Sequence, residues 1–141
     1  MRRYTGVLVG AAVTAALTLA GAPSATAASQ VKSCTTSDGG AVGGMTWNWK
    51  SKKRIDVVLG VTDKASDSAY VRIRLDVTTG KGKRYSFPWH NNKEGKGKSK
   101  SFPGSGTHDD GIVSARVQVE DVRGSSPLAT CYSGKTYNPF Y

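Results

Sequence analysis

A run of cations between Lys81 and Lys100 is the part of this sequence best suited to bind a ligand. It holds seven basic residues and a single acid, Glu94. The basic residues are Lys81, Lys83, Arg84, Lys93, Lys96, Lys98 and Lys100. Clustered cations attract anionic polymers and displace the counterions condensed on them. We therefore predict an anion-binding loop between two strands, with a lysine-solvated hairpin that binds nothing as the alternative.

Aromatic residues accompany these cations and supply a second kind of contact. Tyr85 and Trp89 flank the predicted loop, where a ring can stack on a sugar or a base. Trp47 and Trp49 are two residues apart in an alternating stretch, so they share one face of a strand. On an outer face they would form an aromatic platform for a sugar ring, and on the inner face they would belong to the core. The apolar alternation favours the core, and the sequence leaves both readings open.

No catalytic residues are predicted. His90 or His108 together with Glu94 or Glu120 are the residue types that a nuclease uses as general acid and base. No local motif arranges them for that purpose. A nucleophile elbow, a phosphate-binding P-loop and a dinucleotide-binding glycine motif are also missing from the sequence. We therefore expect a protein without enzymatic activity.

A metal site is not predicted either. Asp109 and Asp110 follow His108 and offer oxygen ligands, but no further ligands recur at a regular spacing. The surrounding glycines indicate an ordinary polar loop. We expect neither a metal nor another cofactor.

The two cysteines, Cys34 and Cys131, are predicted to form a disulfide bond, because an isolated pair in an oxidising compartment usually does so. The bond would close a loop of roughly 100 residues and contribute roughly 4–5 kcal/mol by the chain-entropy model. It also requires the two Cα atoms to lie within about 7 Å of each other. The first and last segments of the domain are therefore expected to be neighbours.

The first 27 residues have the three parts of a cleavable bacterial export signal. Arg2 and Arg3 give a positive start, an uncharged apolar stretch follows, and Ala25-Thr26-Ala27 is a small-residue cleavage pattern. No basic stop-transfer cluster comes next, so no permanent membrane anchor is expected. The mature protein would be residues 28–141, secreted and extracellular, with possible attachment to the cell wall. It would carry 18 basic and 10 acidic residues, a net charge of +8.

A hydrophobic period of two predicts the fold class. Aliphatic and polar residues alternate in 55–62, 71–78 and 113–120, which is typical of half-buried strands in antiparallel sheets. Weaker strands are expected at 31–35, 45–50, 84–89, 98–102 and 128–132, and turns at glycine-rich stretches such as 104–111. About eight strands predict an all-β fold. We expect one small antiparallel β-sandwich over residues 28–141, with an Ig-like arrangement or a distorted barrel as alternatives.

These observations predict a secreted, basic, non-enzymatic binding protein that contacts anionic polymer or cell-wall glycan through its lysine-rich loop. A secreted protease inhibitor is one alternative, with the exposed loop as the inhibitory segment. A secreted nuclease or other hydrolase is another.

Overall fold

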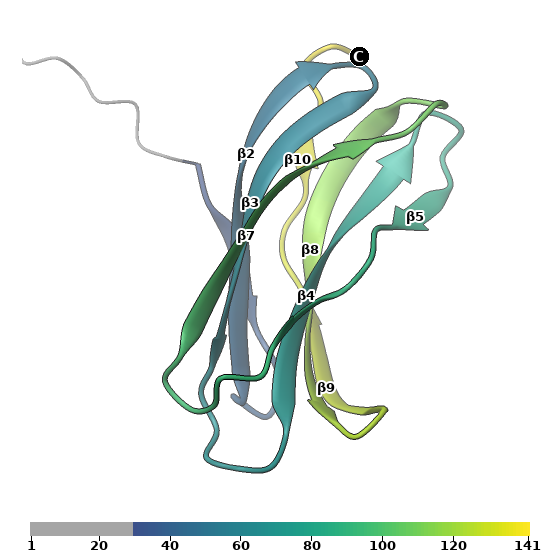
Figure 1. The fold of residues 1–141 in the computed structure, drawn as a ribbon. Helices are drawn as coiled ribbons and strands as arrows, with labels where there is room; N and C mark the ends of the chain where they lie inside the picture. The colour runs from purple at the N-terminus through teal and green to yellow at the C-terminus, as the bar shows by residue number, and fades with distance from the viewer. Residues whose placement is uncertain (1–29) are drawn as a thin grey trace, which may run out of the picture.

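The computed structural model describes residues 30–141, which form ten strands in two antiparallel sheets (Figure 1). The four-stranded sheet has the order β1 (Lys32–Thr35), β2 (Ala41–Ser51), β3 (Arg54–Asp63) and β7 (Ser99–Thr107). In the six-stranded sheet, β4 (Tyr70–Thr79) pairs with β8 (Ile112–Arg123). Strands β5 (Arg84–Ser86) and β6 (His90–Asn92) pair with β4, while β9 (Ser126–Tyr132) and β10 (Thr136–Tyr137) pair with β8.

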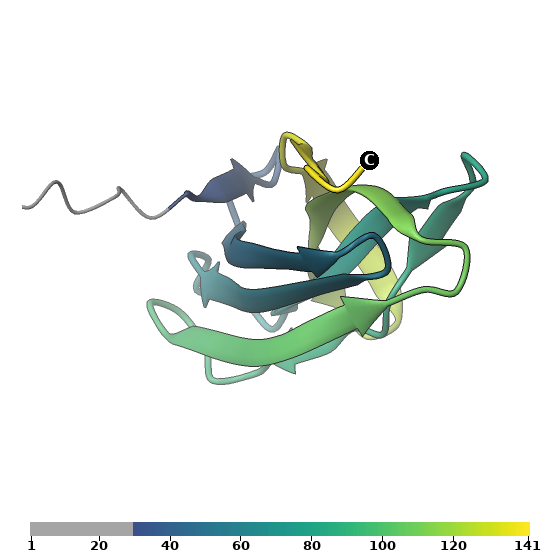
Figure 2. The same cartoon turned by 90° about the horizontal axis from the view of Figure 1, so that it is seen from above.

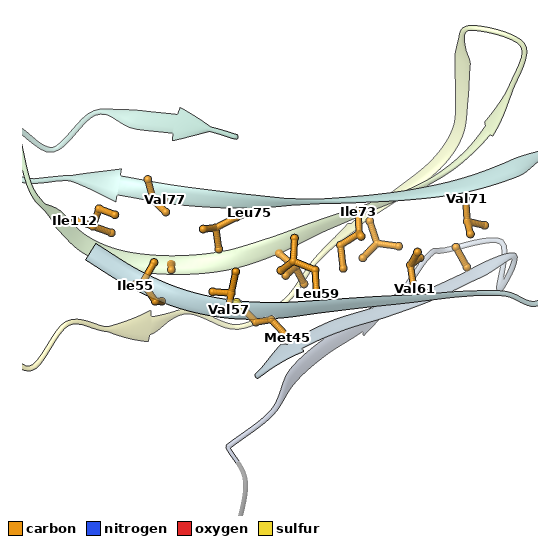
Figure 3. Packing of buried hydrophobic residues seen from close by; sticks show 14 residues of the cluster. Met45, Ile55, Val57, Leu59, Val61, Val71, Ile73, Leu75, Val77 and Ile112 are labelled. Carbon is orange, nitrogen blue, oxygen red and sulfur yellow. The ribbon is translucent and has the colours of Figure 1, made fainter. Parts of the chain in front are cut away.

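The two sheets face each other as separate layers, which gives a sandwich-like arrangement (Figure 2). Their inner faces meet in a core of aliphatic side chains (Figure 3). The core includes Ile55, Val57, Leu59 and Val61 from β3 and Val71, Ile73, Leu75 and Val77 from β4. These are the alternating residues that predicted the strands, so the all-β prediction is confirmed. Within residues 30–141, no helix is long and apolar enough to cross a bilayer.

The predicted disulfide is confirmed. Cys34 on β1 is bonded to Cys131 on β9, and their Cα atoms are 6.0 Å apart. The bond therefore links the two sheets along one side of the sandwich. A disulfide is consistent with an extracellular protein. The predicted export signal, residues 1–27, lies outside the residues that the structure describes.

The strand count and several strand boundaries differ from the sequence prediction. Ten strands are present where about eight were expected, because β6 and β10 are too short to show a period. Residues 104–107 were expected to be part of a turn, yet they continue β7 in register with β3. The reason is close packing at Gly106, where an added Cβ would lie 2.8 Å from Leu75 Cδ2. A glycine at this position keeps the strand flat against the core.

The segment from Lys81 to Lys100 is not a hairpin. Strand β5 and strand β6 both pair with β4 in the six-stranded sheet, whereas β7 pairs with β3 in the other sheet. The chain between Asn92 and Ser99 therefore crosses from one sheet to the other. The predicted loop is a crossover at the end of the sandwich, and its cations do not form one continuous finger.

Candidate anion-binding face

The lysines predicted to act together lie at opposite ends of the sandwich. Lys81 and Lys83 are in the turn after β4, at the end that also holds the C-terminus (Figure 1). Lys93, Lys96 and Lys98 are in the β6–β7 crossover, next to the start of β4. The ten residues of β4 separate the two groups by roughly 30 Å. Lys100 lies on β7 with its ammonium group 5.9 Å from the ring of Phe102.

The crossover that carries Lys93, Lys96 and Lys98 is held in place by Asn92. This side chain is fully buried, and its Nδ2 donates to the carbonyls of Val61, at 3.3 Å, and Lys98, at 2.9 Å. The backbone of Asp63 adds two hydrogen bonds to the same loop, through Gly97 and Lys98. The lysines therefore project from an ordered loop.

Acidic residues share that end of the sandwich with the crossover lysines. Asp63, which contacts the crossover, belongs to a group with Asp38, Asp67 and Asp121. Burial raises the pKa of Asp121 to about 6, and the negative charges of Asp38, Asp67 and Asp63 add to the shift. The effect of burial agrees with the exposure of the Asp121 side chain, which is only 2%. The local field of these carboxylates opposes the binding of an anion by the crossover lysines.

The strongest gathering of cations with aromatic rings is on the outer face of the six-stranded sheet. Alternate residues of β4 and β8 point away from the core, and β5 extends the same surface. We call this surface the arginine face, defined by Arg72, Arg74, Arg84 and Arg116. Two carboxylates accompany the four guanidinium groups, Asp76 and Glu120. These six side chains carry a net charge of +2, and Arg74 is the arginine among them without a carboxylate partner in residues 30–141.

Cross-strand register places these side chains in rows. Arg72 lies opposite Glu120, and the pair is joined by an ion pair of 2.6 Å. Arg74 lies opposite Gln118, whose Oε1 accepts a hydrogen bond of 2.8 Å from Arg74 Nε. Arg74 forms no ion pair with any residue in the described part of the chain. Its charge is therefore available to an external anion.

Asp76 holds two of the arginines in position. Its Oδ1 accepts a hydrogen bond of 2.6 Å from Arg84 Nε, and its Oδ2 accepts one of 2.8 Å from Arg116 Nε. Ser86 Oγ donates a third at 2.8 Å. Burial acts to raise the pKa of Asp76, but the hydrogen bonds from Arg84, Arg116 and Ser86 outweigh it and lower the pKa below its ordinary value. Asp76 therefore stays ionised and holds each of the two guanidinium groups by its Nε atom.

Two aromatic rings cover the guanidinium groups. The Trp89 ring centroid is 4.3 Å from Arg72 Cζ and 4.2 Å from Arg74 Cζ. The Tyr132 ring contacts Arg116 at 4.2 Å and Arg84 at 5.0 Å. Cation–π contacts of this kind fix the direction of an arginine side chain. The rings serve here as supports for cations, which leaves them poorly placed as platforms for a base or a sugar.

The remaining aromatic candidates lie elsewhere. Trp47 and Trp49 are half-buried and pack against the core. Trp49 Nε1 donates to Thr136 Oγ1 at 3.4 Å. Tyr85 is 43% exposed and contacts the rings of Phe87 and His108 at its side of the sandwich.

The histidines and glutamates do not converge on a catalytic site. His90 lies opposite the inward-facing Ile73 and stacks on Phe102 with a centroid separation of 4.8 Å. Glu120 is on the outer face of the same sheet, paired with Arg72. His108 and Glu94 are separated by the whole of β7. Among residues 30–141, no group of three or more histidine, cysteine or acidic side chains is suited to hold a metal ion.

A larger surface hollow lies on the other sheet and has a different chemistry. It measures 660 Å³ and lies over β2, β3 and β7, where Thr46, Asn48 and Ser105 contribute neutral side chains. Its two charged residues, Arg54 and Asp56, pair with each other at 2.9 Å. Nothing in this hollow favours an anion.

Comparison with known proteins adds no functional information, because no protein-family model, no curated protein and no solved structure matches the chain.

Several residues of the arginine face are absent from the site predicted from sequence. Arg72, Arg74 and Arg116 were visible as polar members of alternating strands, and Tyr132 as part of a weak strand. The sequence does not show how the strands that carry these residues pair, and this pairing brings them beside Arg84 and Trp89. Of the predicted binding residues, only these last two lie on the arginine face.

Proposed function

We propose that this protein is a secreted, non-enzymatic binding module for anionic polymers, and that its main contact surface is the arginine face. Export rests on the signal pattern of residues 1–27 and on the disulfide. The binding role rests on the arrangement of charge. The protein then acts by attaching itself to a negatively charged matrix such as cell-wall material.

The observation that carries this proposal is the set of four arginines held by Asp76, Trp89 and Tyr132 on one sheet face. Arginine has a large side-chain entropy, so a fixed guanidinium group loses less freedom when an anion binds. Surface lysines that serve only solubility need no such support. The crossover lysines, by contrast, lie beside four aspartates and are assigned a minor, long-range role.

The first test is retention of residues 28–141 on isolated Gram-positive cell walls, RNA and a neutral polysaccharide, at roughly 50 and 200 mM salt. Ionic binding predicts retention on the anionic materials that falls steeply at the higher salt concentration. No retention on any anionic material contradicts the proposal. Salt-insensitive retention on the neutral polysaccharide contradicts it as well, because an apolar or hydrogen-bonded sugar contact would then be responsible.

A second candidate function, inhibition of a protease, is favoured by one observation. An inhibitory loop has to be rigid before it binds, and the crossover loop is braced by Asn92 and Asp63. The exposed side chain at its tip is Lys96. Incubation with serine, cysteine and metalloproteases tests this candidate. Undiminished protease turnover at micromolar protein would eliminate it.

A further inference from the structure

A groove at one end of the arginine face has the composition of a discrete anion subsite. It measures 210 Å³ and lies over β4 and β8, between the β4–β5 turn and the segment that leads into β10. Arg84, Arg116 and Lys135 line it. Asp76 also lines the groove, and its two oxygens are occupied by the two arginines.

The donors around this groove have unused hydrogen-bonding capacity. Arg116 uses Nε for Asp76, and its two terminal nitrogens have no partner within residues 30–141. Arg84 uses Nε and one terminal nitrogen, which contacts Gln118 and Tyr132 at 3.2 Å each. The Lys135 ammonium forms no ion pair in the same range. Three cationic side chains from separate strands or segments therefore present free N–H groups to one small volume.

A serine hydroxyl also belongs to the groove lining. Ser114 lies opposite Thr78 in the β4–β8 ladder, and both residues line the groove. Ser114 is only 3% exposed. The Ser114 hydroxyl can donate a hydrogen bond to an oxygen atom that enters the groove.

We infer that this groove binds a phosphate group of the polymer, and that the polymer has a sugar- or alditol-phosphate backbone without bases. The inference rests on the proposed function and specifies its ligand. Arginine recognises phosphate through two parallel N–H groups, and Arg84 and Arg116 each keep terminal N–H groups free for this purpose. The absence of bases follows from Trp89 and Tyr132, whose rings are engaged by guanidinium groups.

The first experiment measures binding of residues 28–141 to three polymers by titration calorimetry: poly(glycerol phosphate), poly(U) RNA and polygalacturonate. We expect poly(glycerol phosphate) to bind most tightly. Lys135→Gln is expected to weaken its binding about tenfold, as does the loss of one charged hydrogen bond. Ser114→Ala is expected to weaken it about threefold to tenfold. Lys64→Gln, which removes one exposed charge at the opposite end of the sandwich, is expected to change it less than twofold.

The second experiment follows inorganic phosphate by backbone-amide NMR of the same protein. Chemical-shift changes centred on Ser114, Arg116 and Lys135 support the subsite. If they occur although no polymer is retained, the proposed function is contradicted and the subsite is not. If the polymer binds but Lys135→Gln and Ser114→Ala weaken its binding no more than Lys64→Gln does, the subsite is overturned. The proposed function survives in that case. Equal binding of polygalacturonate overturns the phosphate assignment, and tighter binding of poly(U) overturns the base-free polymer. Folding of each variant is checked by the dispersion of the same NMR spectra.

Discussion

Gly43 and Val119 lie against each other in the interior, and the disulfide bridges the two sheets in the same row. A Cβ added to Gly43 would be 2.5 Å from Val119 Cγ2. Gly43 is the register partner of Cys34, and Val119 is the register partner of Cys131. The covalent bond and this close contact therefore draw the same parts of the two sheets together. A side chain at Gly43 would push apart the strands that the disulfide holds.

We predict that Gly43→Ala destabilises the fold by about 1–3 kcal/mol, because an extra methyl group overpacks a filled core. Val119, Ile73 and the carbonyl of Gly60 surround the position, so the neighbours have little room to move. Gly104→Ala is the matched control, since nothing lies within 4 Å of an added Cβ there. The control is expected to change the free energy of unfolding by less than about 0.5 kcal/mol. Guanidinium denaturation measures both, and equal values for the two variants would contradict the packing argument.

Loss of the disulfide is predicted to cost roughly 4–5 kcal/mol, because the bond closes a long loop in the unfolded chain. The cysteines are 97 positions apart in the sequence. The double variant Cys34→Ser, Cys131→Ser is compared with the oxidised protein by guanidinium denaturation. A midpoint that stays unchanged in the double variant would show that the bond adds no stability.

The sandwich was predictable where local alternation determines burial, and the site was not. The stretch from Ile55 to Val61 is predicted as a strand because every second residue is a branched aliphatic. His90–Asn92 form a strand only because β4 offers a free edge, which no local pattern reveals. Gly106 looked like part of a turn, since its close packing against Leu75 comes from a distant segment. Arg84 and Arg116 likewise come together because β5 and β8 each pair with β4 in a particular register. The pairing of distant strands also divides the run of lysines between the two ends of the sandwich.

We predict that Asp121→Asn stabilises the protein by about 1–3 kcal/mol at pH 7 and changes its stability little at pH 4. The pKa of Asp121 is about 6 in the folded protein, against about 3.9 in an unfolded chain. The folded state therefore binds the proton more tightly, and its stability falls as the pH rises from about 4 to about 6. An asparagine never ionises and avoids this loss.

Denaturation at both pH values measures the difference between variant and parent. Asp109→Asn, at an exposed position, is the control and is expected to be neutral at both. A gain of equal size at pH 4 and pH 7, or a loss at pH 7, would contradict the assignment to ionisation of Asp121.

Arg74 and Lys96 distinguish the arginine face from the lysine-rich crossover as the polymer-binding surface. Each substitution by glutamine removes one positive charge that has no carboxylate partner in the described part of the chain. Arg74→Gln is expected to weaken binding to an anionic polymer about threefold to tenfold and to lower the salt-dependence slope by about 1, because one fixed phosphate contact is lost. Arg72 is unsuitable for this test, since its removal would strand the nearly buried Glu120.

Lys96→Gln is expected to change the affinity less than about twofold and to leave the salt-dependence slope nearly unchanged, because aspartates share its end of the sandwich and salt screens the remaining long-range attraction. Affinity is measured at several salt concentrations on the same polymer for parent and variants. The opposite order, with Lys96→Gln the more damaging change, would return the binding site to the crossover loop. Equal losses would mean that net charge alone drives binding, since only a fixed contact makes one position more important than another.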